Sequence, residues 1–305
     1  MRQTTQSVTA RSYHLNQGRL LLQTMRPKQW AKNVFVWAAL LFDVKLFKPQ
    51  PFARTLLTFV LFCLVSSAVY IINDLVDIEQ DRKHPSKRYR PLASGALNPR
   101  LALWAAIGII LVTVPFTLWL DRWLPLLLYG YLGLMIAYSF WLKNIVIVDV
   151  LAVAAGFVLR VAAGVLIIEA ERFSPWIYVC TVLLALFVAL GKRRQEIVLM
   201  KENANDTRAI LGEYNVHFLD EMLALVSSST VMAYSLYTFS APNLPPNHTM
   251  MLTIPFVLYG LFRYLYLIHV KGETDPPDVV IFKDRPLLLD VIMFGMVVFV
   301  VFYIL

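Results

Sequence analysis

Nine apolar runs, each long enough to cross a lipid bilayer, follow one another along this chain of 305 residues. A hydrocarbon core of about 30 Å is crossed by roughly 20 apolar residues in a helix. The runs cover residues 30–47, 55–74, 101–120, 123–142, 145–168, 175–191, 217–239, 251–270 and 286–305. Because backbone polar groups in hydrocarbon must bond within a helix or a closed barrel, the sequence predicts an all-α bundle of nine transmembrane helices. The first run contains Asp43 and Lys45, which leaves a short or broken helix open there.

The composition excludes an ordinary soluble domain. Hydrophobic residues make up 58% of the chain and charged residues only 16%, whereas soluble domains are about one-quarter charged. The formal net charge of +8 therefore reflects the loops and does not indicate nucleic-acid binding. Cys63 and Cys180 both lie in apolar runs, where cysteine behaves as a small hydrophobe, so we expect neither a disulfide framework nor a zinc site.

Lysine and arginine gather in alternate loops and predict the orientation of the bundle. They are frequent in residues 2–32, 82–100, 143, 192–208 and 271–285, and scarce in the loops between these. Since basic loops stay in the cytoplasm, we expect a cytoplasmic N-terminus, an external C-terminus and a cavity facing the cytoplasm. Residues 1–25 are expected to form a cytoplasmic arm that is not a cleaved leader, and residues 26–305 one transmembrane domain.

An acidic motif follows the second apolar run directly. Asp74, Asp77 and Asp81 are spaced so that a helix would place them on one face, with Asn73 beside them. Stacked carboxylates repel unless a cation lies between them, and Mg²⁺ combines a few carboxylates with water and phosphate oxygens. We therefore predict that these four residues bind Mg²⁺ and that the three aspartates are catalytic. A solvated helix end is the alternative, which the basic tract of residues 82–90 makes less favourable.

The acidic motif and the downstream sequence from Arg90 to Gly95, Arg-Pro-Leu-Ala-Ser-Gly, resemble the first signature of the UbiA-type prenyltransferase superfamily. The resemblance covers nearly the whole chain, because the number of spans and the place of the motif also agree. It implies a helical intramembrane enzyme that uses Mg²⁺ to expel diphosphate from its donor substrate.

The chain departs from the typical superfamily sequence at one motif, and this difference points to one branch of the superfamily. Where typical members carry a second aspartate motif, this chain reads Gly-Lys-Arg-Arg-Gln-Glu at residues 191–196. Arginine and lysine bind phosphate directly. Together with Arg-Pro-Lys-Gln-Trp-Ala-Lys-Asn at residues 26–33, this looks like the decaprenyl-phosphate phosphoribosyltransferase branch. That resemblance implies phosphoribosyl diphosphate as donor and a polyprenyl phosphate as acceptor. The alternative for Lys192 to Arg194 is a simple basic anchor at the end of a helix.

Further candidates are polar residues at or within the predicted spans. Arg160 lies well inside the fifth run, where a charge is costly without a partner, and Asp149 lies three turns earlier on the same face, so the two could share a cavity. We expect Arg160 to meet a substrate phosphate or that carboxylate, and a purely structural pair is the alternative. Lys143 ends the fourth run, and is either a ligand or an interfacial anchor. His84 could contact ribose or phosphate, and the loop of residues 272–285 could cap the site; a solvated loop is the alternative for both. The predicted substrate-binding residues are Lys28, Asn73, Lys87, Arg88, Arg90, Lys143, Arg160, Lys192, Arg193 and Glu196.

The sequence thus favours an Mg²⁺-dependent transfer of 5-phosphoribose from phosphoribosyl diphosphate to a polyprenyl phosphate in a bacterial-type plasma membrane. One alternative is an ordinary UbiA-type prenyltransferase acting on an aromatic or glycerol-phosphate acceptor, against which the missing second aspartate motif argues. Another is a transporter of phosphorylated solutes, which has no use for three carboxylates at metal-binding spacing.

Overall fold

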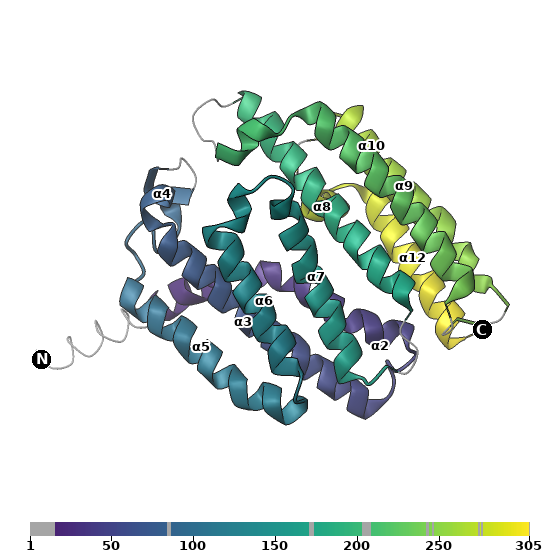
Figure 1. Ribbon diagram of the computed structural model, residues 1–305, viewed down its shortest axis with the longest axis horizontal. Helices are drawn as coiled ribbons and strands as arrows, with labels where there is room; N and C mark the ends of the chain where they lie inside the picture. The colour runs from purple at the N-terminus through teal and green to yellow at the C-terminus, as the bar shows by residue number, and fades with distance from the viewer. Residues whose placement is uncertain are drawn as a thin grey trace, which may run out of the picture.

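The computed structural model describes residues 16–83, 87–170, 174–202, 209–241, 244–245, 247–273, 275 and 277–304. In this part of the chain the regular structure is entirely helical (Figure 1). Residues 16–24 are helical as well. The further elements are η1 (Pro27–Trp37), α2 (Ala38–Phe42), α3 (Pro49–Val76), α4 (Ile78–Lys83), η2 (Lys87–Tyr89), α5 (Pro99–Leu120), α6 (Leu124–Phe140), η3 (Leu142–Asn144), α7 (Val148–Ile167), α8 (Pro175–Glu202), η4 (Ala209–Glu213), α9 (Val216–Ser240), η5 (Thr249–Thr253), α10 (Ile254–His269), α11 (Pro277–Lys283) and α12 (Arg285–Tyr303).

The all-helical membrane architecture agrees with the prediction, but helix length supports fewer than nine spans. Among the described residues, seven helical segments are long and apolar enough to cross a membrane, and α6, with 17 residues, is a shorter apolar helix. The predicted first span is not one α-helix, because residues 27–42 form the 3₁₀-helix η1 followed by the short α2. The count of nine crossings therefore stays a prediction.

The unusual η1 segment is held against its neighbours by a close backbone approach. A Cβ atom added to Gly164 of α7 would lie 2.2 Å from the carbonyl oxygen of Val36. Only glycine allows this contact, so α7 and η1 pack closely in the middle of the bundle. Val36 and Leu40 are fully buried there beside Phe62 of α3 and Leu128 of α6. This packing fixes the polar residues of η1 against α3 and α7.

The loops predicted to be cytoplasmic lie together at one end of the bundle. Lys143 Nζ of η3 lies 3.6 Å from Asp77 Oδ1 at the end of α3, and Arg194 Nε of α8 donates to Asp220 Oδ1 of α9 over 2.5 Å. Residues 16–24, from the predicted arm, pack here too, because Gln17 Nε2 donates to the Ala96 carbonyl over 2.8 Å. We call this the polar end.

The alternate loops meet at the opposite end. Arg54 at the start of α3 donates to the carbonyl oxygen of Leu120 at the end of α5 over 2.9 Å. Lys45 donates to the carbonyl oxygen of Ile168, after α7, over 3.1 Å. The loops rich in lysine and arginine and the loops poor in them therefore lie at opposite ends of the bundle, as the alternation predicted. In Figure 1, α5 and α9 lie at opposite edges, with α3 and α7 between them.

Candidate active site

Two arginines converge on one buried carboxylate at the polar end. Asp74, in the last turn of α3, accepts a hydrogen bond of 2.6 Å from Arg26 Nη2 and one of 3.3 Å from Arg90 Nη1. Arg26 also lies over the ring of Tyr70, 5.0 Å from its centroid. The backbone of Arg26 is left-handed, with φ 54°, which is uncommon for a residue with a Cβ. The start of η1 thus adopts an unfavourable conformation that brings a guanidinium onto Asp74.

Of the other two aspartates of the motif, Asp77 lies at a break in the helix and Asp81 lies beyond it. The helix is interrupted within the motif, because α3 ends at Val76, Asp77 occupies its C-cap, and α4 begins at Ile78. Asp81 is nevertheless brought close to Asp74, since Arg90 Nη1 bonds both carboxylates, Asp81 Oδ2 at 2.7 Å. Arginine supplies the cation that the stacked carboxylates require.

The motif also offers oxygen atoms to a metal ion. Asn73 Oδ1 is buried and accepts no hydrogen bond from the described residues, and amide and carboxylate oxygens are ligands that Mg²⁺ takes. The described residues contain no group of three His, Cys, Asp or Glu side chains close enough to hold a metal by themselves. Mg²⁺ commonly binds one or two carboxylates and completes its shell with water and phosphate oxygens. Asn73 and Asp74 fit such a site.

The predicted basic ligands in η1 and in the loop before α5 differ in their exposure. Lys28 and Arg88 are exposed and Lys87 is half-buried. Arg88 lies 4.8 Å from the ring centroid of Tyr89 and donates to its hydroxyl over 2.6 Å. Lys28 and Arg88 are therefore accessible from solvent. The candidate His84 falls outside the described residues.

Arg160 is engaged by neutral groups, and the contact with Asp149 that the sequence left open is not formed. Its Nε donates to Asn33 Oδ1 over 2.7 Å, its Nη2 to the Tyr131 hydroxyl over 2.9 Å and its Nη1 to the Gly156 carbonyl over 2.7 Å. No carboxylate among the described residues forms an ion pair with it, although the residue is only 6% exposed. Arg160 therefore ties η1 to α6 and α7 as a buried cation.

Asp149 pairs instead with Arg193 of the predicted cationic cluster. Arg193 Nη2 lies 2.6 Å from Asp149 Oδ2, and its Nη1 donates to Glu196. The hydroxyl of Tyr214 donates to Asp149 Oδ1 over 2.7 Å. Burial, followed by this hydrogen bond, raises the pKa of Tyr214 to about 12. The side chains of Arg193 and Asp149 are 6% and 0% exposed, so this network closes the polar end between α7 and α8.

The three basic residues 192–194 do not form one cationic surface. They lie inside α8, which continues to Glu202, and successive residues of a helix point in directions about 100° apart. Lys192 is exposed, Arg193 points inward to Asp149, and Arg194 turns to Asp220 of α9. Only Lys192 is placed to meet a ligand from solvent without breaking a bond.

The loop of residues 272–285, a weak candidate, carries internal ion pairs. Asp284 caps α12 by accepting from the Leu287 amide over 2.9 Å, and Arg263 Nη2 donates to its other oxygen over 2.9 Å. The Arg263 guanidinium holds the pKa of Asp284 below its usual value. Lys283 Nζ donates to Asp275 Oδ2 over 2.7 Å. These contacts fix the start of α12.

The structure adds functional candidates that the sequence reasoning did not assign, above all Arg26. Asn33 and Trp30 follow it in η1. Asn33 Nδ2 donates to Ser66 Oγ over 3.1 Å, and Trp30 Nε1 to Ser67 Oγ over 3.0 Å. The sequence pattern drew attention to residues 26–33 as a segment. The role of each residue depends on its contacts with α3, which the sequence of the segment does not predict. These bonds lie about 11 Å deeper than Asp74 along α3, at about 1.5 Å per residue.

Comparison with known proteins agrees with this architecture. The model of the UbiA prenyltransferase family matches residues 34–283. A decaprenyl-phosphate phosphoribosyltransferase of Corynebacterium glutamicum is 30% identical over 275 residues, covering 88% of this chain and 82% of the relative. An enzyme of the same name from Mycolicibacterium smegmatis is 31% identical over 280 residues, 88% of this chain and 87% of the relative.

Solved structures share the fold at lower identity. A UbiA homologue of Archaeoglobus fulgidus bound to GPP and Mg²⁺ superposes with a TM-score of 0.69 at 20% identity, covering 93% of this chain and 100% of that one. A structure of digeranylgeranylglyceryl phosphate synthase gives a TM-score of 0.67 at 14% identity, over 95% and 99% of the two chains. At identities of 20% and 14%, these structures show a shared fold and do not indicate a shared substrate.

Proposed function

The chain belongs to the UbiA prenyltransferase family, and from this premise we propose that it transfers 5-phosphoribose from phosphoribosyl diphosphate to a polyprenyl phosphate. It is a UbiA-family transferase of the membrane. The names of relatives about 30% identical over 88% of the chain favour this reaction within the family. The fold alone is equally compatible with prenyl transfer, so the proposal depends on the site.

The observation that carries the proposal is the sharing of Arg90 between Asp74 and Asp81, with Arg26 on the same oxygen of Asp74. Carboxylates that suit a metal ion and guanidinium groups that suit phosphate lie within bonding distance of one another. Asp77 faces Lys143 at 3.6 Å, so the three carboxylates meet three cations. A substrate with several phosphates would compete for these cations and free the carboxylates.

A bound Mg²⁺ would be held by Asn73, Asp74 and Asp77, with Asp81 beside them, and would neutralise charge on the departing diphosphate. Arg26 and Arg90 bind the phosphates of the donor, since a guanidinium makes forked bonds to phosphate oxygens. Lys28, Lys87 and Arg88 add charge from the exposed side, and Lys192 does so at α8. Arg193 binds Asp149 and Glu196 and so holds α7 and α8 together beside the site. Arg160 holds η1 in position through Asn33.

In the proposed reaction, the bond between ribose C1 and a diphosphate oxygen breaks and the electron pair leaves with diphosphate. Positive charge develops at C1, as in glycosyl transfer generally. An oxygen of the lipid phosphate then bonds to C1. A phosphate ester with a second pKa of about 6 is ionised at neutral pH, so this attack needs no general base. The site's work is positioning and charge stabilisation.

The direct test uses the purified full-length chain in lipid nanodiscs, with phosphoribosyl diphosphate labelled in the ribose and a polyprenyl phosphate. We expect Mg²⁺-dependent transfer of label into the lipid fraction with release of diphosphate. Asp77→Asn should lose nearly all of this activity. Glu79→Gln is the matched control, because Glu79 lies between Asp77 and Asp81 but is exposed and pairs with Arg82 on the surface.

Parallel reactions separate the alternatives. Transfer of a polyprenyl chain from its diphosphate to an aromatic or glycerol-phosphate acceptor, with no ribose transfer, would show an ordinary prenyltransferase. Uptake of labelled phosphoribosyl diphosphate into sealed vesicles without lipid product would show a transporter. Either result overturns the proposed reaction.

The proposal includes an orientation, with the polar end in the cytoplasm where a soluble sugar phosphate is available. The excess of lysine and arginine in the loops of that end supports this placement.

A further inference from the structure

The helix of residues 16–24 packs along the loop of residues 90–98, which leads into α5. Leu21 of this helix packs against a buried cluster that includes Leu92 and Leu97 of the loop. Both loop leucines are almost completely buried. The N-terminal helix therefore belongs to the packed structure of the polar end, next to the acidic motif.

The side chain of Gln17 bonds this loop at two points of its backbone. Its Nε2 donates to the carbonyl oxygen of Ala96 over 2.8 Å, and its Oε1 accepts from the amide of Asn98 over 3.1 Å. Gln17 is only 5% exposed. A side-chain amide offers both a donor and an acceptor, so these two bonds fix the loop on both sides of Leu97.

The point that Gln17 fixes is joined directly to Arg90. The amide of Leu97 donates to the carbonyl oxygen of Pro91 over 2.8 Å and so closes the loop on itself. Gly95 allows the tight turn, because its φ of 78° is a conformation that glycine adopts freely. Pro91 follows Arg90, whose guanidinium bonds two carboxylates of the acidic motif. A shift of the loop at Gln17 would therefore move that guanidinium.

The same helix also leads into the second arginine of the site. The amide of Arg26 donates to the carbonyl oxygen of Gln23 over 3.2 Å, so helical bonding extends to the residue whose side chain bonds Asp74. One short helix thus carries one guanidinium of the site and holds the loop of the other.

We infer that Gln17 is a positioning residue of the phosphate site, whose amide holds the loop so that Arg90 meets a phosphate of the donor substrate. It acts on the ligand through Arg90, because forked bonds to phosphate depend on the placement of the guanidinium. This role rests on the proposed binding of phosphate by Arg90. Diphosphate is released in phosphoribosyl transfer and in prenyl transfer alike, so it probes the role whichever group the donor carries.

The test measures equilibrium binding of radiolabelled inorganic diphosphate, with Mg²⁺, to the full chain in phosphatidylcholine nanodiscs. We expect Gln17→Leu, which keeps the size of the side chain but loses both bonds, to bind about tenfold more weakly, the scale of one charge-assisted hydrogen bond. Gln23→Leu is the matched control. Gln23 lies on the same helix with an exposed side chain, and its substitution should leave binding unchanged.

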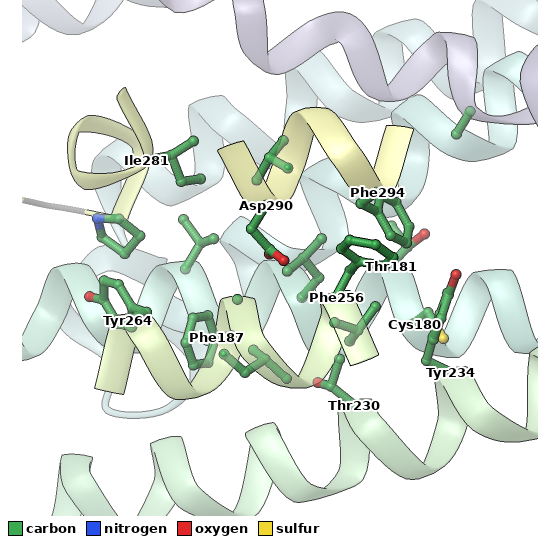
Figure 2. A pocket seen from close by; sticks show the side chains of 18 of the residues that line it. Cys180, Thr181, Phe187, Thr230, Tyr234, Phe256, Tyr264, Ile281, Asp290 and Phe294 are labelled. Atoms are coloured by element: carbon green, nitrogen blue, oxygen red, sulfur yellow. The ribbon is translucent and has the colours of Figure 1, made fainter. Parts of the chain in front are cut away.

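A second control separates positioning from a general loss of stability. Figure 2 shows Tyr234 at an apolar cavity between α8, α9, α10 and α12, and its hydroxyl lies 2.6 Å from Thr253 Oγ1. Tyr234 follows Asp220 of the polar end by fourteen residues of α9, about 21 Å at 1.5 Å per residue. Tyr234→Phe loses a buried hydrogen bond, as Gln17→Leu does, but should bind diphosphate like the natural chain.

The combination of Gln17→Leu with Arg90→Lys tests whether Gln17 acts through Arg90. Lysine keeps the charge, and so keeps binding measurable, but it cannot make a forked bond. In this background Gln17→Leu should weaken diphosphate binding by less than about twofold, because residues that act through one contact are not additive. An equal tenfold loss in both backgrounds overturns the inference, as does unchanged binding by Gln17→Leu alone.

If Gln17→Leu does not fold, Gln17→Glu at about pH 8 takes its place in the same comparison. An ionised carboxylate has acceptors only, so it keeps the bond from the Asn98 amide and loses the bond to Ala96. In the transfer reaction, either variant should raise KM for the donor more than it lowers kcat. Diphosphate binding that follows this pattern without any transfer of ribose would refute the proposed reaction and leave the role of Gln17 standing.

Discussion

Replacing Arg193 by alanine should destabilise the bundle far more than replacing its neighbour Lys192. The two residues lie side by side in α8 and carry the same charge, but Lys192 is exposed while Arg193 is buried against Asp149 of α7. The pair of substitutions therefore separates the effect of burial from the effect of charge. Truncating Arg193 leaves Asp149 as a fully buried carboxylate that still accepts a hydrogen bond from the hydroxyl of Tyr214.

Breaking a buried ion pair by removing one partner typically costs about 3–5 kcal/mol, because the other charge stays buried. A solvent-exposed charge contributes about 0–1 kcal/mol. Since about 1.4 kcal/mol is tenfold, Arg193→Ala should lower the ratio of folded to unfolded protein by about two to four powers of ten. The double variant Asp149→Asn/Arg193→Gln removes both charges and should recover most of the loss, which measures the coupling of the two sites.

The measurement is reversible unfolding of the purified chain in mixed micelles with increasing denaturing detergent, followed by tryptophan fluorescence. Equal stability of Arg193→Ala and Lys192→Ala would refute the structural role of the pair. If Arg193→Ala were then also to raise KM for phosphoribosyl diphosphate, the side chain would be a substrate ligand, as its sequence position first suggested.

Three further expectations concern the metal, the topology and the pH. Activity should vanish in EDTA and return with Mg²⁺, and Asp77→Asn should lose several kcal/mol of transition-state stabilisation; full activity in chelator contradicts the metal site. In a background without native cysteines, a cysteine at Glu79 should react with an impermeant thiol reagent only after cell lysis, and one at Asn247 in intact cells; the reverse pattern inverts the orientation. Because Arg263 lowers the pKa of Asp284, their contribution to stability should be complete above the usual aspartate pKa near 4 and disappear as the pH falls through the lowered value, a loss absent in Arg263→Gln.

Hydropathy alone predicted most of the spans, because a helix in hydrocarbon must be apolar over its whole length. The runs 101–120, 145–168 and 217–239 correspond to Pro99–Leu120, Val148–Ile167 and Val216–Ser240 in the structure. The first run was one exception, and the run 123–142, whose helix α6 has only 17 residues, was another. In the first run the α-helix is replaced over most of its length. The composition of this run is apolar, but Asp43 and Lys45 interrupt it, and contacts with α3 and α7 hold it as a 3₁₀-helix.

The acidic motif, the basic segments and the family were also recognisable from the spacing of residues. The spacing did not predict which charged side chains pair with one another. Arg160 and Asp149 lie on one face of α7, yet each bonds elsewhere, because η1 brings Asn33 to the arginine and α8 brings Arg193 to the aspartate. The sequence by itself determined which polar residues enter the membrane domain. The packing of helices distant in sequence decided which of them meet, since a buried charge takes the nearest partner in space, whatever its distance along the chain.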